Sequence, residues 1–324
     1  YLIYRGHHPP VGVGPFGAAM AGAVVLGFDA ATTLNALAIA GSHSAGLIEY
    51  TRTGGSVKRI HSAIPTQAGV RAALFAQAGI TGPHSILEGE KGFCKVFAGD
   101  YDLARLTEGL GTRYHLLDNA LKPYSCCHLI HAAFDALDAL REREPLRAQD
   151  VRHITVYTNS EPILSHIGSI VEPEDVLGAQ FSLPFSMAMR LHHGGRGVNA
   201  GNGFWDYPRA NLKDPALLDT ARRVKCVVAD RNEWAAVDKG AGIEVETHDG
   251  RRLREIVPYS KGLPENPLTE AEVKEKFAAL VEPIVPKGRV QEIIAAVNGI
   301  ETIRDIDALA RLLVVPRADR MPGH

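Results

Sequence analysis

The 324-residue sequence lacks an excess of charge of either sign. Lysine and arginine total 35 and aspartate and glutamate total 37, which gives a formal net charge of −2 at pH 7. A general nucleic-acid-binding protein needs a basic excess to pair with phosphates, so we expect no nucleic-acid partner. Hydrophobic residues make up 45% of the chain, which excludes a disordered chain dominated by charge.

Cysteine and long apolar runs are also scarce. The few cysteines, Cys94, Cys126, Cys127 and Cys226, do not make a secreted disulfide framework, so we expect a cytoplasmic protein. The longest apolar run, residues 16–28, is shorter than the about 20 residues of a membrane-spanning helix, which predicts a buried helix and no membrane partner. Because the chain begins with tyrosine rather than methionine, we expect that an N-terminal segment is missing.

What is abundant in the first part of the chain is alanine and glycine. These small side chains predict closely packed helices, and we expect residues 1–119 to be all α. Asp29 is a suitable N-cap for a helix that ends at Gly41. The predicted helices span residues 16–27, 30–40, 45–50, 66–77 and 100–110.

Strand patterns join the helical ones after residue 120, which predicts an α+β organisation. Residues 151–158 and 224–229 favour strands, and Asp249-Gly250 between two alternating runs predicts a hairpin. Thr269 and Glu272 predict a capping box at the start of a helix. Further helices are predicted over residues 127–142, 176–192 with Pro184 limiting the length, 216–223 and, as a closing pair, 287–313.

The first cluster of candidate functional residues is the string RGHHPP at residues 5–10, followed by a glycine-rich turn. His7 and His8 before such a turn predict an imidazole at the mouth of a cleft, and neutral histidine suits proton transfer near pH 7. An exposed turn is the alternative. The string GVGPFG has no preceding strand and no following Lys-Ser/Thr, which excludes a P-loop.

The second cluster is the string GGSVKRIH at residues 54–61. Lys58, Arg59 and His61 fall within four residues just before the start of a predicted helix. A lysine charge, an arginine fork and unpaired helix N–H groups together predict an anion site. A solvated basic turn is the alternative.

The third cluster is the string KPYSCCH at residues 122–128, with His131 after it. A thiol at a helix N-terminus has a lowered pKa, and Cys127 with a histidine would suit a thiol-dependent hydrolase. No orienting Asn or Asp is identified, and a buried structural cysteine is the simpler interpretation. We expect no metal site, because no second pair of ligands accompanies Cys127 and the histidines.

These strings together resemble those of the MmgE/PrpD family, which includes 2-methylcitrate dehydratase and cis-aconitate decarboxylase. The resembling strings stand in the family's order between residues 5 and 188. They are RGHHPPVGVGPFGAA, GSHSAGLIEY, GGSVKRIHSAIPTQAGVRAALFAQAGITGP, ILEGEKGFCKVF, KPYSCCHLIHAAFDAL and AQFSLPFSMA.

The resemblance implies a mainly α fold with an α+β part, made of a large all-α helical domain and a smaller α+β lid domain. Residues 1–119 then form the helical domain, 120–283 the lid, and 284–324 the C-terminal helices that return to the helical domain. It also implies a homodimer that needs no cofactor and acts on a small-molecule carboxylate substrate, a di- or tricarboxylate, at a carbon next to a carboxylate.

The resemblance also assigns roles residue by residue. His8 matches the histidine of the family's G-x-H-P-like string, Lys58 the lysine of its K-R-x-H string, and Lys122 the lysine that opens the lid string. The residues implied to be catalytic are His8, Lys58, Lys122, His61 and Cys127. Those implied to bind substrate are Arg59, His7, Cys126 and His128.

Two departures from the family pattern stand out. Some members carry a histidine five positions after the lysine matched by Lys122, where this chain has Cys127 followed by His128. The family's N-terminal helical segment carries an Asp, a Thr and a His that line the active site, and this chain starts shortly before His8. We therefore expect a truncated chain, a second polypeptide that supplies these groups, or an inactive protein.

The expected chemistry is proton abstraction next to a carboxylate, which builds negative charge that positioned cations stabilise. Lys58, Arg59 and Lys122 would bind carboxylates, His8 would be the general base or acid, and His61 a second proton carrier. Cys126 or Cys127 would donate a proton to the opposite face in an epimerisation. A dehydration like that of 2-methylcitrate dehydratase, by a hydro-lyase, is the expected reaction. Epimerisation, decarboxylation and a non-catalytic fragment or degenerate paralogue are the alternatives.

Overall fold

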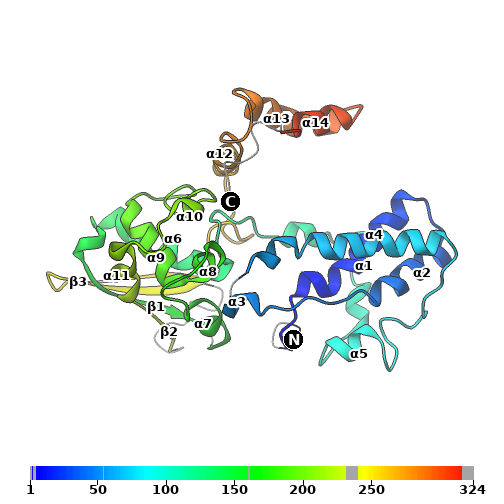
Figure 1. Ribbon diagram of the computed structural model, residues 1–324, viewed down its shortest axis with the longest axis horizontal. Coiled ribbons are helices and arrows are strands. Elements are labelled where there is room, and N and C mark those ends of the chain that lie inside the picture. Colours follow the sequence, from blue (N-terminus) through cyan, green and yellow to red (C-terminus); the bar gives the residue numbers. More distant parts are fainter. Residues whose placement is uncertain (1, 3–4, 54, 160, 231–239, 316–324) are drawn as a thin grey trace. The chain divides into compact units, whose positions relative to one another are not determined.

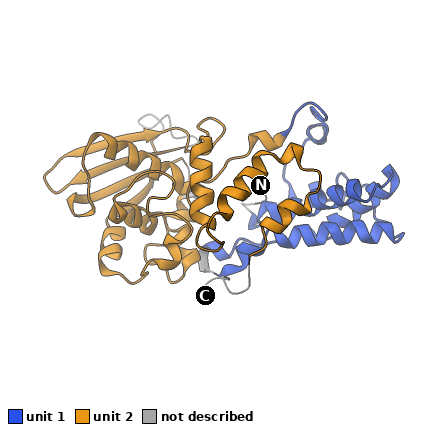
Figure 2. Ribbon diagram, turned by 90° about the horizontal axis from the view of Figure 1, so that it is seen from above, with its two compact units in different colours: residues 1–114 blue, residues 115–324 orange. Residues whose placement is uncertain are grey.

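The computed structural model describes residues 2, 5–53, 55–159, 161–230 and 240–315, without the side chains of residues 52, 53 and 161–163. The chain divides into two compact units, Tyr1–Tyr114 and His115–His324, which Figure 2 shows in different colours. Each unit is described by itself. In the described part of the chain, no helix combines the length and the apolar character needed to cross a membrane.

The first unit is helical, as the sequence predicts. Its described residues form no strand pairing beyond a single bridge between His7 and Leu47. Its helices are α1 (Pro9–Val25), α2 (Ala30–Gly41), α3 (Tyr50–Thr53), η2 (Ser56–Ile60), α4 (Ala63–Gln77), α5 (Phe93–Phe97) and η3 (Leu103–Leu106). The second unit begins with η4 (His115–Asp118).

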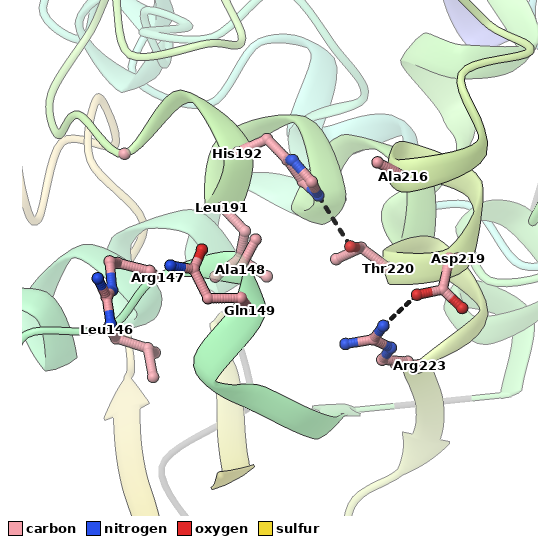
Figure 3. A pocket seen from close by; sticks show the side chains of 11 residues that line it. Leu146, Arg147, Ala148, Gln149, Leu191, His192, Ala216, Asp219, Thr220 and Arg223 are labelled. Carbon is pink, nitrogen blue, oxygen red and sulfur yellow. Dashed lines mark hydrogen bonds and ion pairs between the residues drawn. The ribbon is translucent and has the colours of Figure 1, made fainter. Parts of the chain in front are cut away.

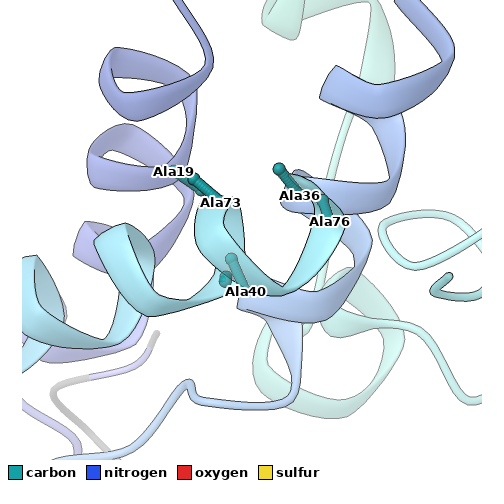
Figure 4. Close-up of a cluster of buried hydrophobic side chains, with 6 residues drawn as sticks. Ala19, Ala36, Ala40, Ala73 and Ala76 are labelled. Carbon is teal, nitrogen blue, oxygen red and sulfur yellow. The ribbon is translucent and has the colours of Figure 1, made fainter. Parts of the chain in front are cut away.

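Helices α1, α2 and α4 pack closely through alanine, which confirms the interpretation of the small residues. Buried alanines from all three helices form one cluster (Figure 4). A Cβ atom built on Gly69 of α4 would lie 2.4 Å from the carbonyl oxygen of Pro15 in α1. Glycine is therefore required where α4 crosses α1. Asp29 caps α2 as predicted, because its carboxylate accepts a hydrogen bond from the Thr32 N–H at 2.8 Å.

The predicted glycine-rich turn after His8 is wrong, because α1 begins at Pro9. Proline fits the first positions of a helix, where the N–H groups have no partner in the helix. Gly14 lies inside α1, and a Cβ atom there would lie 2.7 Å from the Cβ atom of Pro65 in α4. Gly14 thus allows α1 and α4 to pack closely and is not part of a turn.

Two further predictions for the first unit need correction. Residues 45–50 do not form a helix, since Gly46 has φ of +92° and this segment pairs with residues 6–8. The backbone N–H of His8 donates to the Gly46 carbonyl at 3.1 Å. The helix predicted over residues 100–110 shrinks to η3, a single 3₁₀ turn.

The second unit is built around a small mixed sheet of strand order β2-β1-β3-β4. Strands β1 and β2 are parallel and the other pairs antiparallel, while α6 packs against β3 and β4, and α9 against β2 (Figure 1). Its strands are β1 (Val151–Thr158), β2 (Val224–Val228), β3 (Ala241–Thr247) and β4 (Arg252–Val257). Its helices are η5 (His128–Ile130), α6 (His131–Arg143), η6 (Ala148–Asp150), α7 (Glu161–Ile167), α8 (Val176–Phe181), α9 (Leu183–His193), α10 (Asp206–Arg209), α11 (Pro215–Arg222), α12 (Glu270–Val281), α13 (Arg289–Asn298), η8 (Ile300–Thr302) and α14 (Asp307–Leu312).

Most predictions for this unit are confirmed, among them both strands, the hairpin and the capping box of Thr269 and Glu272. The helix predicted over residues 176–192 is divided into α8 and α9. Ser182 ends α8 and caps α9 by accepting a hydrogen bond from the Phe185 N–H at 3.0 Å. Mainly helical structure with a small sheet is what the fold prediction requires, whereas the lid layout and the boundaries at residues 119 and 283 stay predictions.

Candidate functional site

A pair of histidines is the centre of the candidate site in the first unit. The Nδ1 atoms of His8 and His61 lie 2.9 Å apart, so one ring donates a hydrogen bond and the other accepts it. His8 directly precedes α1, where its backbone is tied to Gly46, and His61 directly follows η2. Two segments far apart in the sequence thus position the two rings.

Tyr50 and Lys58 complete the surroundings of this pair. The Tyr50 ring, 6% exposed, meets both imidazoles edge-on, with ring centroids 5.8 Å from His8 and 5.4 Å from His61. His61 is 4% exposed, and its burial, followed by the charge of Lys58, lowers its pKa. The imidazole of His61 is therefore neutral at pH 7 and can accept or relay a proton.

Arg59 and His7, the other predicted residues of the first unit, have different surroundings from the pair. Lys58 is half-buried in η2, whereas Arg59 next to it is exposed. His7 turns its ring against Phe97 of α5, with the centroids 5.2 Å apart, and its buried Nδ1 has no hydrogen-bond partner. The geometry therefore brings together His8, Lys58 and His61, and it separates His7 from them.

The second unit holds the segment from Lys122 to His128 in a fixed conformation. The Ser125 N–H donates to the Asn202 carbonyl at 2.9 Å, and Gln180 Nε2 donates to the Ser125 carbonyl at 2.7 Å. The Cys127 N–H donates to the Gln180 carbonyl at 2.9 Å. The Lys122 ammonium folds back and donates to the Cys126 carbonyl at 3.0 Å.

The two adjacent cysteines are both buried in this segment. Burial, followed by the neighbouring Cys127, raises the pKa of the Cys126 thiol to about 12. The prediction of a lowered thiol pKa is therefore wrong for Cys126, because the thiol packs inside the unit rather than at an exposed helix start. None of the chain's cysteines, all of which lie in the described residues, forms a disulfide.

Two histidines follow the cysteines. His128 is half-buried, its Nε2 lies 3.2 Å from the Ser260 hydroxyl, and burial followed by the charge of Lys122 lowers its pKa. His131 at the start of α6 is fully buried and meets Tyr124 and His128 edge-on. Burial holds the pKa of His131 well below its usual range, and both rings are therefore uncharged at pH 7.

A buried ionic network, which the sequence did not predict, packs against this segment at Tyr124. Arg190 of α9 is fully buried, pairs with Asp138 of α6 and stacks its guanidinium 4.6 Å above the Tyr124 ring. It also donates to the Ala200 carbonyl at 3.0 Å. A single arginine within the apolar stretch of α9 was the available signal, because a charge is buried only when it is paired.

A cavity of about 450 Å³ in the second unit lies apart from the predicted residues (Figure 3). Its charged and polar groups already pair with neighbours: Arg223 with Asp219, and His192 with the Thr220 hydroxyl at 2.8 Å. We therefore do not assign the candidate site to it. Among the described residues, no group of three or more His, Cys, Asp or Glu side chains is arranged to hold a metal ion.

Comparison with known proteins gives matches along most of the chain. The model of the MmgE/PrpD N-terminal domain matches residues 3–106, and that of the C-terminal domain matches residues 124–302. A cis-aconitate decarboxylase from Aspergillus terreus is 27% identical over 330 residues, which cover 97% of this chain and 66% of the relative. Those from Mus musculus and Homo sapiens are each 24% identical, covering 97% and 95% of this chain and 63% of each relative. The chain thus spans about two thirds of the length of these relatives.

Proposed function

Since the chain belongs to the MmgE/PrpD family, we propose that it is a lyase that needs no cofactor and acts on a small di- or tricarboxylate. The reaction begins with transfer of a proton at a carbon next to a carboxylate. The observation that carries this proposal is the hydrogen bond between His8 and His61 beside the charge of Lys58. The two rings are candidate proton carriers and Lys58 is a cation, and these are the two kinds of group that this chemistry needs.

The histidine pair supplies the base. When Nδ1 of His8 donates to the neutral His61, Nε2 of His8 is the atom that takes a proton from carbon. The electron pair of that C–H bond then forms the carbon–carbon double bond, and the neighbouring C–O bond breaks. The Nδ1 proton of His8 passes to His61, and the Nε2 proton of His61 passes to the hydroxyl, which leaves as water. Lys58 and Arg59 stabilise the negative charge that builds on the adjacent carboxylate, and His61 is the second proton carrier.

The second unit supplies further groups. Lys122 is the second proposed carboxylate-binding cation. His7, Cys126 and His128 stay proposed substrate-binding residues, and Cys127 stays a proposed proton donor. The raised pKa of the Cys126 thiol keeps that group protonated at neutral pH, which disfavours Cys126 as a nucleophile.

Dehydration, as by 2-methylcitrate dehydratase, is our first candidate reaction. Decarboxylation is the second, because the relatives from Aspergillus terreus and Mus musculus are named cis-aconitate decarboxylases. Dehydration and decarboxylation need the catalytic group in opposite protonation states. Dehydration requires a base at the start, whereas decarboxylation requires an acid that protonates the resulting carbanion. A cytoplasmic homodimer is part of the same proposal.

The test offers methylcitrate, citrate and cis-aconitate to the full chain and follows loss of water, release of CO₂ and exchange of deuterium separately. His8→Ala and Lys58→Ala should each lower kcat/KM for the accepted substrate by about 100-fold or more. His193→Gln, a substitution at an exposed histidine of α9, is the control and should leave kcat/KM unchanged. Unchanged kcat/KM in both site variants, or no turnover of any of these substrates, would refute the proposal.

A further inference from the structure

Two lysines converge on the turn between Lys122 and Cys126 in the second unit. The Lys122 ammonium donates to the Cys126 carbonyl at 3.0 Å, and the ammonium of Lys276, on α12, donates to the Lys122 carbonyl. Within the described part of the chain, neither ammonium forms an ion pair with a carboxylate. Two positive charges therefore meet at one turn without a compensating charge from the protein.

Asp135 and Glu272, two carboxylates of this unit, are engaged with other groups. Asp135 accepts from the Tyr124 hydroxyl at 2.6 Å and from the Lys261 N–H at 2.7 Å. Glu272, one helical turn before Lys276, pairs with the Lys261 ammonium at 3.1 Å and accepts from the Thr269 N–H at 2.7 Å. These two carboxylates therefore do not pair with the ammonium of Lys122 or of Lys276.

The neighbouring His131 is uncharged and offers no negative charge to offset the two lysines. His131 is fully buried, and neither of its ring nitrogens has a hydrogen-bond partner. Lys276 is itself half-buried, and burial followed by the charge of Lys122 lowers its pKa. Like charges held together at a half-buried position are unfavourable, and an anion that binds between them removes this cost.

The turn also borders a space that can hold a ligand. A cavity of about 180 Å³ is lined by Lys276 together with Ser125 and Arg209, which is its second lining cation; Lys122 does not line it. Asp206 lines it as well, with its carboxylate accepting from the Gly203 N–H at 2.8 Å. The sum of these lining charges remains positive, so the cavity favours a negatively charged group.

We propose that Lys276, with the charge of Lys122 beside it, binds one carboxylate of a small polycarboxylate at this cavity, which makes Lys276 a further substrate-binding residue. The nature of the ligand rests on the proposed function. Nothing in the sequence indicates this role, because Lys276 lies in a helix with several charged residues, as is typical of a solvated face. The fold alone brings it to Lys122, 154 positions away in the sequence.

The test titrates the full chain with tricarballylate, a tricarboxylate without a hydroxyl to eliminate, in a calorimeter. Removing one charge-assisted hydrogen bond weakens such binding by about tenfold, so Lys276→Gln should raise Kd by that factor. Lys276→Arg, which keeps the charge, should restore most of the affinity. Lys274→Gln on the same helix, where Lys274 pairs with Glu270, is the matched control and should leave Kd unchanged.

A second measurement needs no variant and covers the case in which Lys276→Gln does not fold. Tricarballylate should slow the acetylation of Lys276 in the unaltered chain, as measured by mass spectrometry, and should leave Lys274 unaffected. Binding by the unaltered chain with equal Kd for Lys276→Gln and Lys274→Gln, or with no protection of Lys276, would overturn this inference and leave the proposed function standing. No binding of tricarballylate by the unaltered chain would overturn both.

Discussion

His8 and His61, 53 positions apart in the sequence, share one hydrogen bond between their Nδ1 atoms at 2.9 Å. Only one of these two nitrogens carries a proton while the bond exists, so the state of each ring determines the state of the other. Burial, followed by the charge of Lys58, lowers the pKa of His61, so the His61 ring is neutral at pH 7. The pair thus acts as a unit that holds one proton between two rings.

His61 is predicted to fix which nitrogen of His8 carries the proton. His61→Asn keeps an acceptor near the position of Nδ1 but cannot carry a proton. It should lower kcat/KM less than His61→Leu, which also removes the acceptor and should lower kcat/KM about 100-fold. Nitrogen-15 NMR of the imidazoles reports the tautomer directly and does not depend on turnover. The assignment fails if the His8 tautomer is the same in His61→Leu as in the unaltered chain.

His131 is predicted to make stability depend on pH in one direction. Its pKa is lowered in the folded chain, while in the unfolded chain it titrates near 6.5, so below that pH the unfolded state binds more protons. The free energy of unfolding should therefore be constant above about pH 6.5 and should fall by up to about 1.4 kcal/mol per pH unit below it. His61 and His128, whose pKa values are also lowered, act in the same direction.

Urea unfolding between pH 5 and pH 8 measures this dependence. His131→Phe keeps an aromatic ring in the buried position and should show a shallower decline below pH 6.5, while exposed His193→Gln should match the unaltered chain. An identical decline in His131→Phe and the unaltered chain would contradict the assignment.

Local signals in the sequence account for the elements that were predicted correctly. Asp29 before α2 and Thr269 with Glu272 before α12 satisfy unpaired N–H groups within three residues, so a short window contains the whole interaction. Strand β1 alternates from Ile154 to Thr158, and Asp249-Gly250 lies at the turn of the hairpin between β3 and β4. Each of these features depends on neighbours in the sequence alone.

The features that escaped prediction depend on distant contacts. The glycines after His8 favour a turn locally. The close approach of Pro65 from α4, which requires glycine at position 14 of α1, cannot be seen in the sequence. The sequence named both His8 and His61 as candidates, but their hydrogen bond follows from the pairing of residues 6–8 with residues 46–48. Lys276 has no local feature that separates it from the other charges of α12.

Cys126 is predicted to resist alkylation in the folded chain. The rise of its pKa from 9.0 to about 12 lowers the thiolate population at pH 8 by about 1,000-fold, and burial restricts access further. Mass spectrometry after treatment with iodoacetamide should show half-exposed Cys94 modified first and Cys126 modified only in urea. Rapid modification of Cys126 in the folded chain would contradict the burial and the raised pKa of this thiol.

Arg190 is predicted to be essential to the stability of the second unit. Arg190→Met leaves the carboxylate of Asp138, whose side chain is 13% exposed, without its partner, and breaking such a pair costs about 3–5 kcal/mol. Arg222→Met is the matched control, because its pair with Glu172 is about half exposed on both sides and contributes at most about 1 kcal/mol. Equal losses of unfolding free energy in the two variants would contradict the structural role of Arg190.

Replacement of glycine by alanine can be compared at a crowded position, Gly69, and at an open one, Gly17. An alanine at position 69 of α4 would place its Cβ atom 2.4 Å from the Pro15 carbonyl oxygen, so the two helices must separate. Gly69→Ala should therefore lower the stability of the first unit by about 1–3 kcal/mol. Gly17→Ala in α1, where a Cβ atom meets open space, should instead raise it by about 0.5–1 kcal/mol, since alanine favours a helix. Thermal unfolding followed by circular dichroism measures both, and a change of the same sign in the two variants would show that α1 and α4 do not approach as closely as the alanine and glycine contacts indicate.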